Sequence, residues 1–168
     1  MKKRISTKTV AVLGVLLSAA LILGYVESLI PFDFAIPGIK LGLPNMITLL
    51  LLRKKGIAYA LPFAIARAAL TNLLFGDASA LLYALAGGIV SVAAMYCIGK
   101  IKVFGVCGQS IAGAVGHNIG QLCTAALLTA TPALIIYYLP FLMVSAAVSG
   151  FLIGAGVGIL ENKLGNAI

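Results

Sequence analysis

Long, uninterrupted apolar runs are the feature of this sequence that most constrains its fold. The first extends from Thr9 to Ile30, and five more follow, separated by short basic or Pro- and Gly-containing stretches. A helix needs about 20 apolar residues to cross the hydrocarbon core of a bilayer. Of the 168 residues, 62% are hydrophobic and only 10% are charged, too few to cover a water-soluble domain. The sequence therefore predicts an integral membrane protein.

We expect an all-α protein whose residues 1–168 form a single domain of six transmembrane helices. The predicted segments are 9–30, 41–52, 56–75, 78–99, 106–129 and 134–160. Transmembrane strands alternate in polarity, whereas runs such as 47–52 are apolar on every face, so helices are favoured over a barrel. The second segment is short, and the sequence leaves open whether it crosses the membrane fully, is tilted or is partly re-entrant.

The basic residues lie on one side of this predicted topology. With a cytoplasmic N-terminus, ten of the twelve basic residues fall on the cytoplasmic side, and Lys40 and Arg67 are the exceptions. The ten are Lys2, Lys3, Arg4, Lys8, Arg53, Lys54, Lys55, Lys100, Lys102 and Lys163. Cytoplasmic loops carry such an excess of Lys and Arg. We therefore expect both termini in the cytoplasm, a multi-pass protein of the cell membrane, and no nucleic-acid partner.

Small residues recur at helical spacing in three of the segments. In lipid, helices associate through the close approach of small residues. Two ridges consist of Gly108, Ala112, Gly116 and Gly120, and of Ala146, Gly150, Gly154 and Gly158. The first segment carries Ala11, Gly14, Ser18 and Ala19. These ridges either pack the bundle internally or leave one face free for a partner membrane protein, and the first segment suits that docking.

Polar residues inside the predicted spans are the main functional signal, because a polar group in lipid is costly unless it is paired or lines a cavity. Eight candidates from several segments share the predicted outer half of the membrane. They are Glu27, Lys40, Asn45, Arg67, Asn72, His117, Asn118 and Gln121. They predict an outward-open polar pocket that binds substrate. Alternatively, Arg67 pairs with Glu27, His117 is a packing residue, and Asn118 and Gln121 hold helices together.

Several catalytic site types have no counterpart in the sequence. No GxxxxGK[ST] loop is present, so the chain does not bind and hydrolyse ATP in that way. The four acidic residues are Glu27, Asp33, Asp77 and Glu161, and they are too widely separated for an aspartate-rich magnesium site. His117 has no Cys, Asp or Glu at metal-ligand spacing. We expect a protein that is not an enzyme and that has no metal or cofactor.

Four blocks of sequence resemble a known family. They are residues 25–31 (YVESLIP), residues 38–45 (GIKLGLPN), Arg67 with residues 73–76 (LLFG), and residues 113–121 (GAVGHNIGQ). They are similar to the bacterial Gx transporter family, also labelled heptaprenyl diphosphate synthase component I. That family resembles the substrate-binding (S) components of energy-coupling-factor importers. The resemblance implies an S-component-like six-helix bundle, a transmembrane coupling protein and two ATPase subunits as partners, and docking through the first helix.

Two hypotheses follow from these observations. The first is an S component that imports a vitamin-like or other small organic molecule, with residues 31–40 as a hinged lid and Arg67 and Lys40 favouring an anionic group. The second is a non-catalytic membrane subunit associated with prenyl diphosphate or quinone biosynthesis. Proteins that co-purify with the chain distinguish the two.

Overall fold

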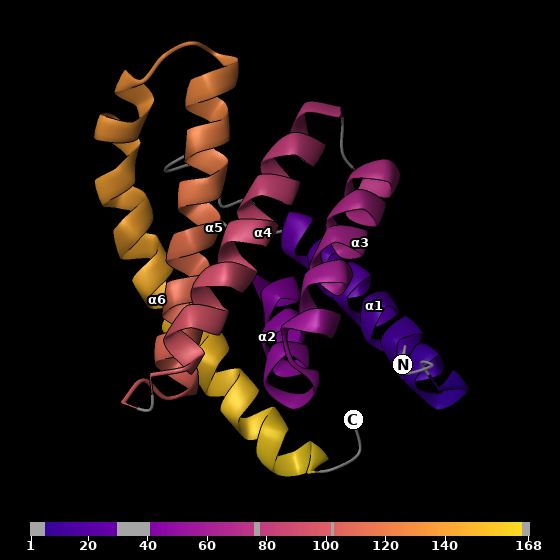
Figure 1. Cartoon of the computed structure of the whole chain (residues 1–168). Helices are drawn as coiled ribbons and strands as arrows, with labels where there is room; N and C mark the ends of the chain where they lie inside the picture. The colour runs from indigo at the N-terminus through magenta and orange to yellow at the C-terminus, as the bar shows by residue number, and fades with distance from the viewer. Residues whose placement is uncertain (1–5, 30–40, 76–77, 102, 166–168) are drawn as a thin grey trace.

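The computed structural model describes residues 6–29, 41–75, 78–101 and 103–165, and they form six α-helices without a β-strand. The helices are α1 (Thr7–Ser28), α2 (Leu43–Lys55), α3 (Ile57–Phe75), α4 (Ala78–Gly99), α5 (Val106–Leu128) and α6 (Ala133–Leu164). The predicted all-α class and the six predicted segments are confirmed, with ends shifted by a few residues. Figure 1 shows the helices gathered into one bundle.

Five of these helices, all except α2, are long and apolar enough to cross a membrane. Large apolar side chains on their outward faces, among them Val15, Leu127 and Ile136, are exposed. In water such a surface would be unfavourable, whereas hydrocarbon accepts it. The chain is therefore a multi-pass membrane protein.

The short helix α2 lies at the centre of the bundle. Its 13 residues span about 20 Å at 1.5 Å per residue, less than the bilayer core of about 30 Å. Gly42, with a φ of 80°, and Pro44 mark its start, and Gly56, with a φ of 86°, ends it. Helix α2 contacts each of the other five helices, and the run 47–52 is buried. Its apolar surroundings on every side explain why this run has no polar face.

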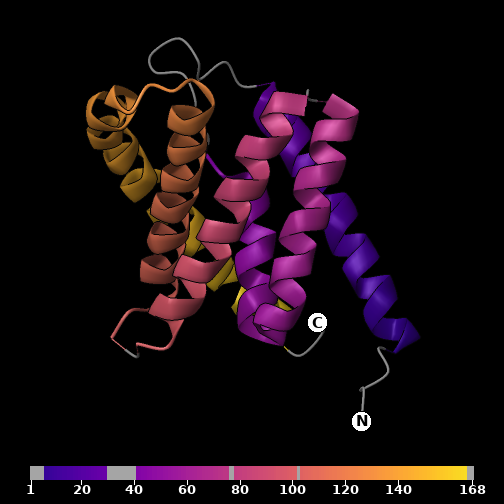
Figure 2. The ribbon, with the colours of Figure 1, turned by 45° about the horizontal axis from the view of Figure 1, so that its top comes forward.

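One end of the bundle, here called the basic end, carries the start of α1, the end of α2 and the end of α6 (Figure 2). Every described lysine and arginine except Arg67 lies there. Arg53 Nε pairs with Glu161 Oε1 at 2.7 Å, and Arg53 Nη1 also donates to Gln109 Oε1. Gln109 Nε2 donates to the carbonyl oxygen of Met95 at 3.1 Å. This chain of contacts links α2, α4, α5 and α6 at the basic end.

The small-residue ridges of α5 and α6 pack inside the bundle. A Cβ atom at Gly120 would lie 2.7 Å from the carbonyl oxygen of Ala86 on α4. A Cβ atom at Gly150 on α6 would lie 2.6 Å from Ile111 Cα on α5. Helices α4, α5 and α6 therefore approach one another more closely than any larger residue would allow at these positions.

The small residues of α1 are placed differently. Ala11, Gly14 and Ser18 are exposed, Ala19 is half-buried, and a Cβ atom at Gly14 would meet nothing within 4 Å. Helix α1 packs with its other face on α2 and α3. Among the three ridges noted in the sequence, the one on α1 is therefore the ridge that the bundle leaves uncovered.

Candidate functional site

Arg67 is the centre of the candidate site. It lies in the middle of α3, is 9% exposed, and its Nη2 atom donates a hydrogen bond to Asn45 Oδ1 at 3.1 Å. Its Nε atom is buried and has no hydrogen-bond partner in the described part of the chain. A buried cation that is only partly hydrogen-bonded is unfavourable in a membrane bundle unless a further polar group or an anion approaches it.

Glu27, at the end of α1, is 7% exposed, and its Oε1 atom accepts a hydrogen bond from the Gly42 backbone N–H at 2.6 Å. Gly42 is the N-cap of α2, where the partial positive charge of the helix dipole favours a carboxylate. Glu27 is close enough to Arg67 to act on it electrostatically, but the structure shows no direct ion pair between these two described side chains. The alternative of a direct Arg67–Glu27 pair is therefore not realised, and Glu27 instead caps α2.

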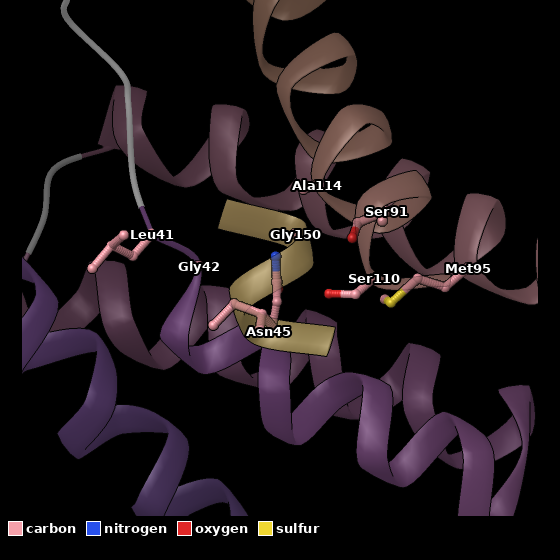
Figure 3. A pocket seen from close by; sticks show the side chains of 10 residues that line it. Leu41, Gly42, Asn45, Ser91, Met95, Ser110, Ala114 and Gly150 are labelled. Atoms are coloured by element: carbon pink, nitrogen blue, oxygen red, sulfur yellow. The ribbon is translucent and has the colours of Figure 1, made fainter. Parts of the chain in front are cut away.

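A cavity of about 20 Å³ lies beside this cluster, where α2, α4, α5 and α6 meet (Figure 3). Asn45, Ser91 and Ser110 contribute polar side chains to its wall. Gly113 and Gly150 also line it, and both pack closely, because a Cβ atom at Gly113 would lie 2.6 Å from Met95 Cγ and one at Gly150 would lie 2.6 Å from Ile111 Cα. A cavity of this size holds about one water molecule, whereas pockets for whole small molecules measure roughly 300–1,000 Å³. It therefore admits a single small group.

The candidate residues of α5 contact the neighbouring helices α4 and α6 rather than Arg67. His117 and Gln121 face α4, where a Cβ atom at Gly87 would lie 2.9 Å from His117 Cε1 and 2.9 Å from Gln121 Cγ. Asn118 Nδ2 donates to the carbonyl oxygen of Leu142 on α6 at 2.9 Å. Asn118 thus joins α5 to α6, and His117 and Gln121 pack against α4.

The remaining candidates are Asn72 and Lys40. Asn72 Nδ2 donates to the carbonyl oxygen of Ala68, one turn earlier in its own helix, at 2.8 Å. Lys40 and the expected lid over residues 31–40 lie outside the described residues. The structure thus brings Glu27, Asn45 and Arg67 together.

Sequence reasoning missed Ser91 and Ser110. Both are nearly fully buried, and the Ser91 hydroxyl has no hydrogen-bond partner among the described residues. Serine is common in membrane helices and usually bonds to its own backbone, so neither residue stands out by type or spacing. Only their meeting at the cavity distinguishes them.

Comparison with known proteins gives one family match. The sequence model of the family described as "Heptaprenyl diphosphate synthase component I" matches residues 16–160. No curated protein matches the chain, and no solved structure does. The matched range covers most of the chain and includes the eight polar candidate residues.

Proposed function

Since the chain belongs to the heptaprenyl diphosphate synthase component I family, also called the Gx transporter family, we propose that it is a substrate-binding membrane subunit. In this proposal it is the S component of an energy-coupling-factor type importer in the cell membrane. Its substrate is a vitamin-like or other small organic molecule with an anionic group. The chain itself performs no catalysis.

Arg67 is the single observation that carries this proposal. Its guanidinium group is buried in mid-helix, bonded to Asn45, and left with an unpartnered Nε atom among the described residues. The nearby Glu27 carboxylate already accepts the Gly42 N–H. An anionic substrate group that approached Arg67 would supply the missing acceptor and offset the cost of burying the cation.

The proposed site residues are Arg67, Asn45 and Glu27, with Asn72, His117, Asn118 and Gln121 as further candidates. The cavity beside Arg67 is small, about 20 Å³, so binding of a whole molecule requires the surrounding helices to separate. A transmembrane coupling protein and two ATPase subunits would supply the energy for release on the cytoplasmic side. Helix α1 would dock the coupling protein through Ala11, Gly14, Ser18 and Ala19, of which the first three are exposed and Ala19 is half-buried against the core.

The family description favours a second candidate function. It names one component of a heptaprenyl diphosphate synthase, which is part of a larger assembly. In that case the chain is a non-catalytic membrane subunit that presents a prenyl substrate to a soluble enzyme, and Arg67 meets a diphosphate oxygen. The proteins that co-purify in mild detergent separate the two functions, because ATPases favour import and a prenyl synthase favours synthesis.

Native mass spectrometry of the protein purified gently from its own membranes tests the proposal. We expect a small organic anion to remain bound to the wild-type chain and to be lost from the Arg67→Ala variant. Lys163→Ala is the matched control, because it removes one positive charge from an exposed position at the basic end. Retention of the same molecule by folded Arg67→Ala protein would show that the site is wrongly assigned.

A further inference from the structure

The cavity beside Asn45 is lined by polar side chains to which the proposed function assigns no role. Ser91 lies in the middle of α4, is only 1% exposed, and its Oγ atom has no hydrogen-bond partner in the described part of the chain. Ser91 and Ser110 both line the cavity, together with Asn45 (Figure 3). A buried hydroxyl without a hydrogen-bond partner is unfavourable. Such a group next to a cavity indicates that something polar binds there.

Arg67 determines which end of the Asn45 amide faces this cavity. A guanidinium group has only donors, so the atom that it contacts must be the amide oxygen, as found at 3.1 Å. The Nδ2 atom is then directed away from Arg67, and Figure 3 shows the Asn45 nitrogen pointing into the cavity. An amide N–H₂ group donates and does not accept. Asn45 therefore presents a donor to whatever enters.

The polar side chains that line the cavity favour a ligand group that accepts hydrogen bonds. Asn45 Nδ2 only donates, and the hydroxyls of Ser91 and Ser110 can donate as well. The positive charge of Arg67 lies directly behind Asn45 and favours a partial or full negative charge. Among the described residues that line the cavity, none is acidic. A volume of about 20 Å³ admits one oxygen-sized group.

From these observations we propose that this cavity is a subsite for one carboxylate or carbonyl oxygen of the bound substrate. Asn45 Nδ2 and Ser91 Oγ donate hydrogen bonds to that oxygen, and Ser110 Oγ completes the wall. Arg67 acts on it both by its charge and by holding the Asn45 amide in the donating orientation. This inference rests on the proposed substrate-binding function and specifies which substrate group reaches the deepest part of the site. The oxygen of a bound water molecule can accept the same hydrogen bonds. The experiment must therefore distinguish a substrate oxygen from water.

Sodium formate, the smallest carboxylate, is the probe. Binding to the full-length protein in detergent is measured by saturation-transfer NMR of ¹³C-formate and by the formate-dependent rise in the thermal unfolding midpoint, with sodium chloride at equal ionic strength as reference. We expect saturable binding of formate but not of methylammonium, a small cation that has donors but no acceptor. Saturable binding of methylammonium, or the absence of saturable formate binding to the wild-type protein, would overturn the subsite and leave water as its occupant.

Two substitutions test whether formate binds at this cavity. Ser91→Ala removes one donor with little change in volume and should weaken formate binding about tenfold. Asn45→Asp keeps an oxygen for Arg67 but replaces the donor with an acceptor, so binding should be lost. Ser145→Ala is the matched control, because the Ser145 hydroxyl bonds to the Leu142 carbonyl within α6. Equal formate affinity in the wild-type and Ser91→Ala proteins would refute the assignment.

The same preparations keep this inference distinct from the proposed function. If the co-purified molecule is lost on Arg67→Ala but is bound with unchanged affinity by Ser91→Ala, the substrate-binding function stands and the subsite is wrong. If formate binds through Ser91 but no organic molecule co-purifies with the wild-type protein, the oxygen subsite stands and the importer proposal loses its support.

Discussion

The polar residues near mid-bundle are organised around one arginine. Arg67 determines the orientation of Asn45, and Asn45 in turn presents its amide nitrogen to the cavity that Ser91 lines. Glu27 contributes differently, because its carboxylate accepts the Gly42 N–H and so joins the end of α1 to the start of α2. Residues predicted to lie at one membrane depth therefore differ in role: Arg67 orients Asn45, Asn45 is proposed to bind substrate, and Glu27 caps α2.

The capping role of Glu27 predicts a loss of stability when the carboxylate is removed. Glu27→Ala leaves the half-buried Gly42 N–H without its charged acceptor and should lower the free energy of unfolding by about 1–3 kcal/mol. Glu27→Gln retains an oxygen acceptor and should cost less. Thermal unfolding in detergent measures both. Ser28→Ala is the control, because the exposed Ser28 hydroxyl bonds to the Tyr25 carbonyl within its own helix, α1. Unchanged stability of Glu27→Ala together with loss of substrate would instead assign Glu27 a direct binding role.

At the scale of helices, glycines decide which elements touch. Helices α4, α5 and α6 pack most extensively in the described bundle, and glycines at their contacts bring backbone against backbone. The first helix has no such close contact at Gly14. The same kind of sequence pattern therefore has an internal role in α5 and α6 and leaves a free face on α1.

Gly120 and Gly158 form a matched pair that tests this packing. A Cβ atom at Gly120 would overlap the backbone of Ala86 at 2.7 Å, so Gly120→Ala should destabilise the bundle by about 1–3 kcal/mol. A Cβ atom at Gly158 meets nothing within 4 Å, so Gly158→Ala should be neutral or stabilising by up to about 1 kcal/mol. Denaturant or thermal unfolding in detergent compares the two. Equal effects would mean that α4 and α5 are not packed through Gly120.

The uncovered face of α1 gives the second prediction at this scale. Gly14→Phe should leave the thermal unfolding midpoint unchanged, because the position is open, yet should prevent docking of the coupling protein. Co-purification of the ATPase subunits, quantified by mass spectrometry, measures docking. Gly158→Phe, on the open side of α6, is the control. If the two variants retain the same amount of partner, α1 is not the docking helix.

At the scale of the whole molecule, the charged residues that the structure describes are unevenly distributed between the two ends of the bundle (Figure 2). The described basic residues gather at one end, where Arg53 links α2 to Glu161 on α6 and to Gln109 on α5. Arg67 and Asn45 lie deeper in the bundle. This separation is what the positive-inside rule expects if the basic end faces the cytoplasm and the opposite end faces outward.

The proposed orientation can be measured by cysteine labelling. In a variant without Cys97, Cys107 and Cys123, single cysteines are introduced by Thr131→Cys, between α5 and α6, and by Lys163→Cys at the basic end. A membrane-impermeant maleimide should label the Thr131→Cys protein on intact cells and the Lys163→Cys protein only after permeabilisation. The reverse pattern would place both termini outside and would require substrate to enter from the cytoplasmic side.

The sequence by itself determined the membrane class, the six helices and the basic end, and its eight polar candidates included Glu27, Asn45 and Arg67, which the structure brings together. These properties follow from hydropathy, charge and helical spacing, which are local along the chain. The family resemblance likewise followed from short blocks of residues, and the match over residues 16–160 confirmed it.

Only the tertiary structure decided the central position of α2, the capping partner of Glu27 and the inclusion of Ser91 and Ser110 at the cavity. It also decided which small-residue ridge stays uncovered. Each of these depends on the rotation of a helix about its own axis and on its neighbours. In a chain where almost every helix face is apolar, hydropathy does not encode that rotation. The rotation of each helix is established instead by close backbone contacts, which glycines such as Gly120 and Gly150 permit.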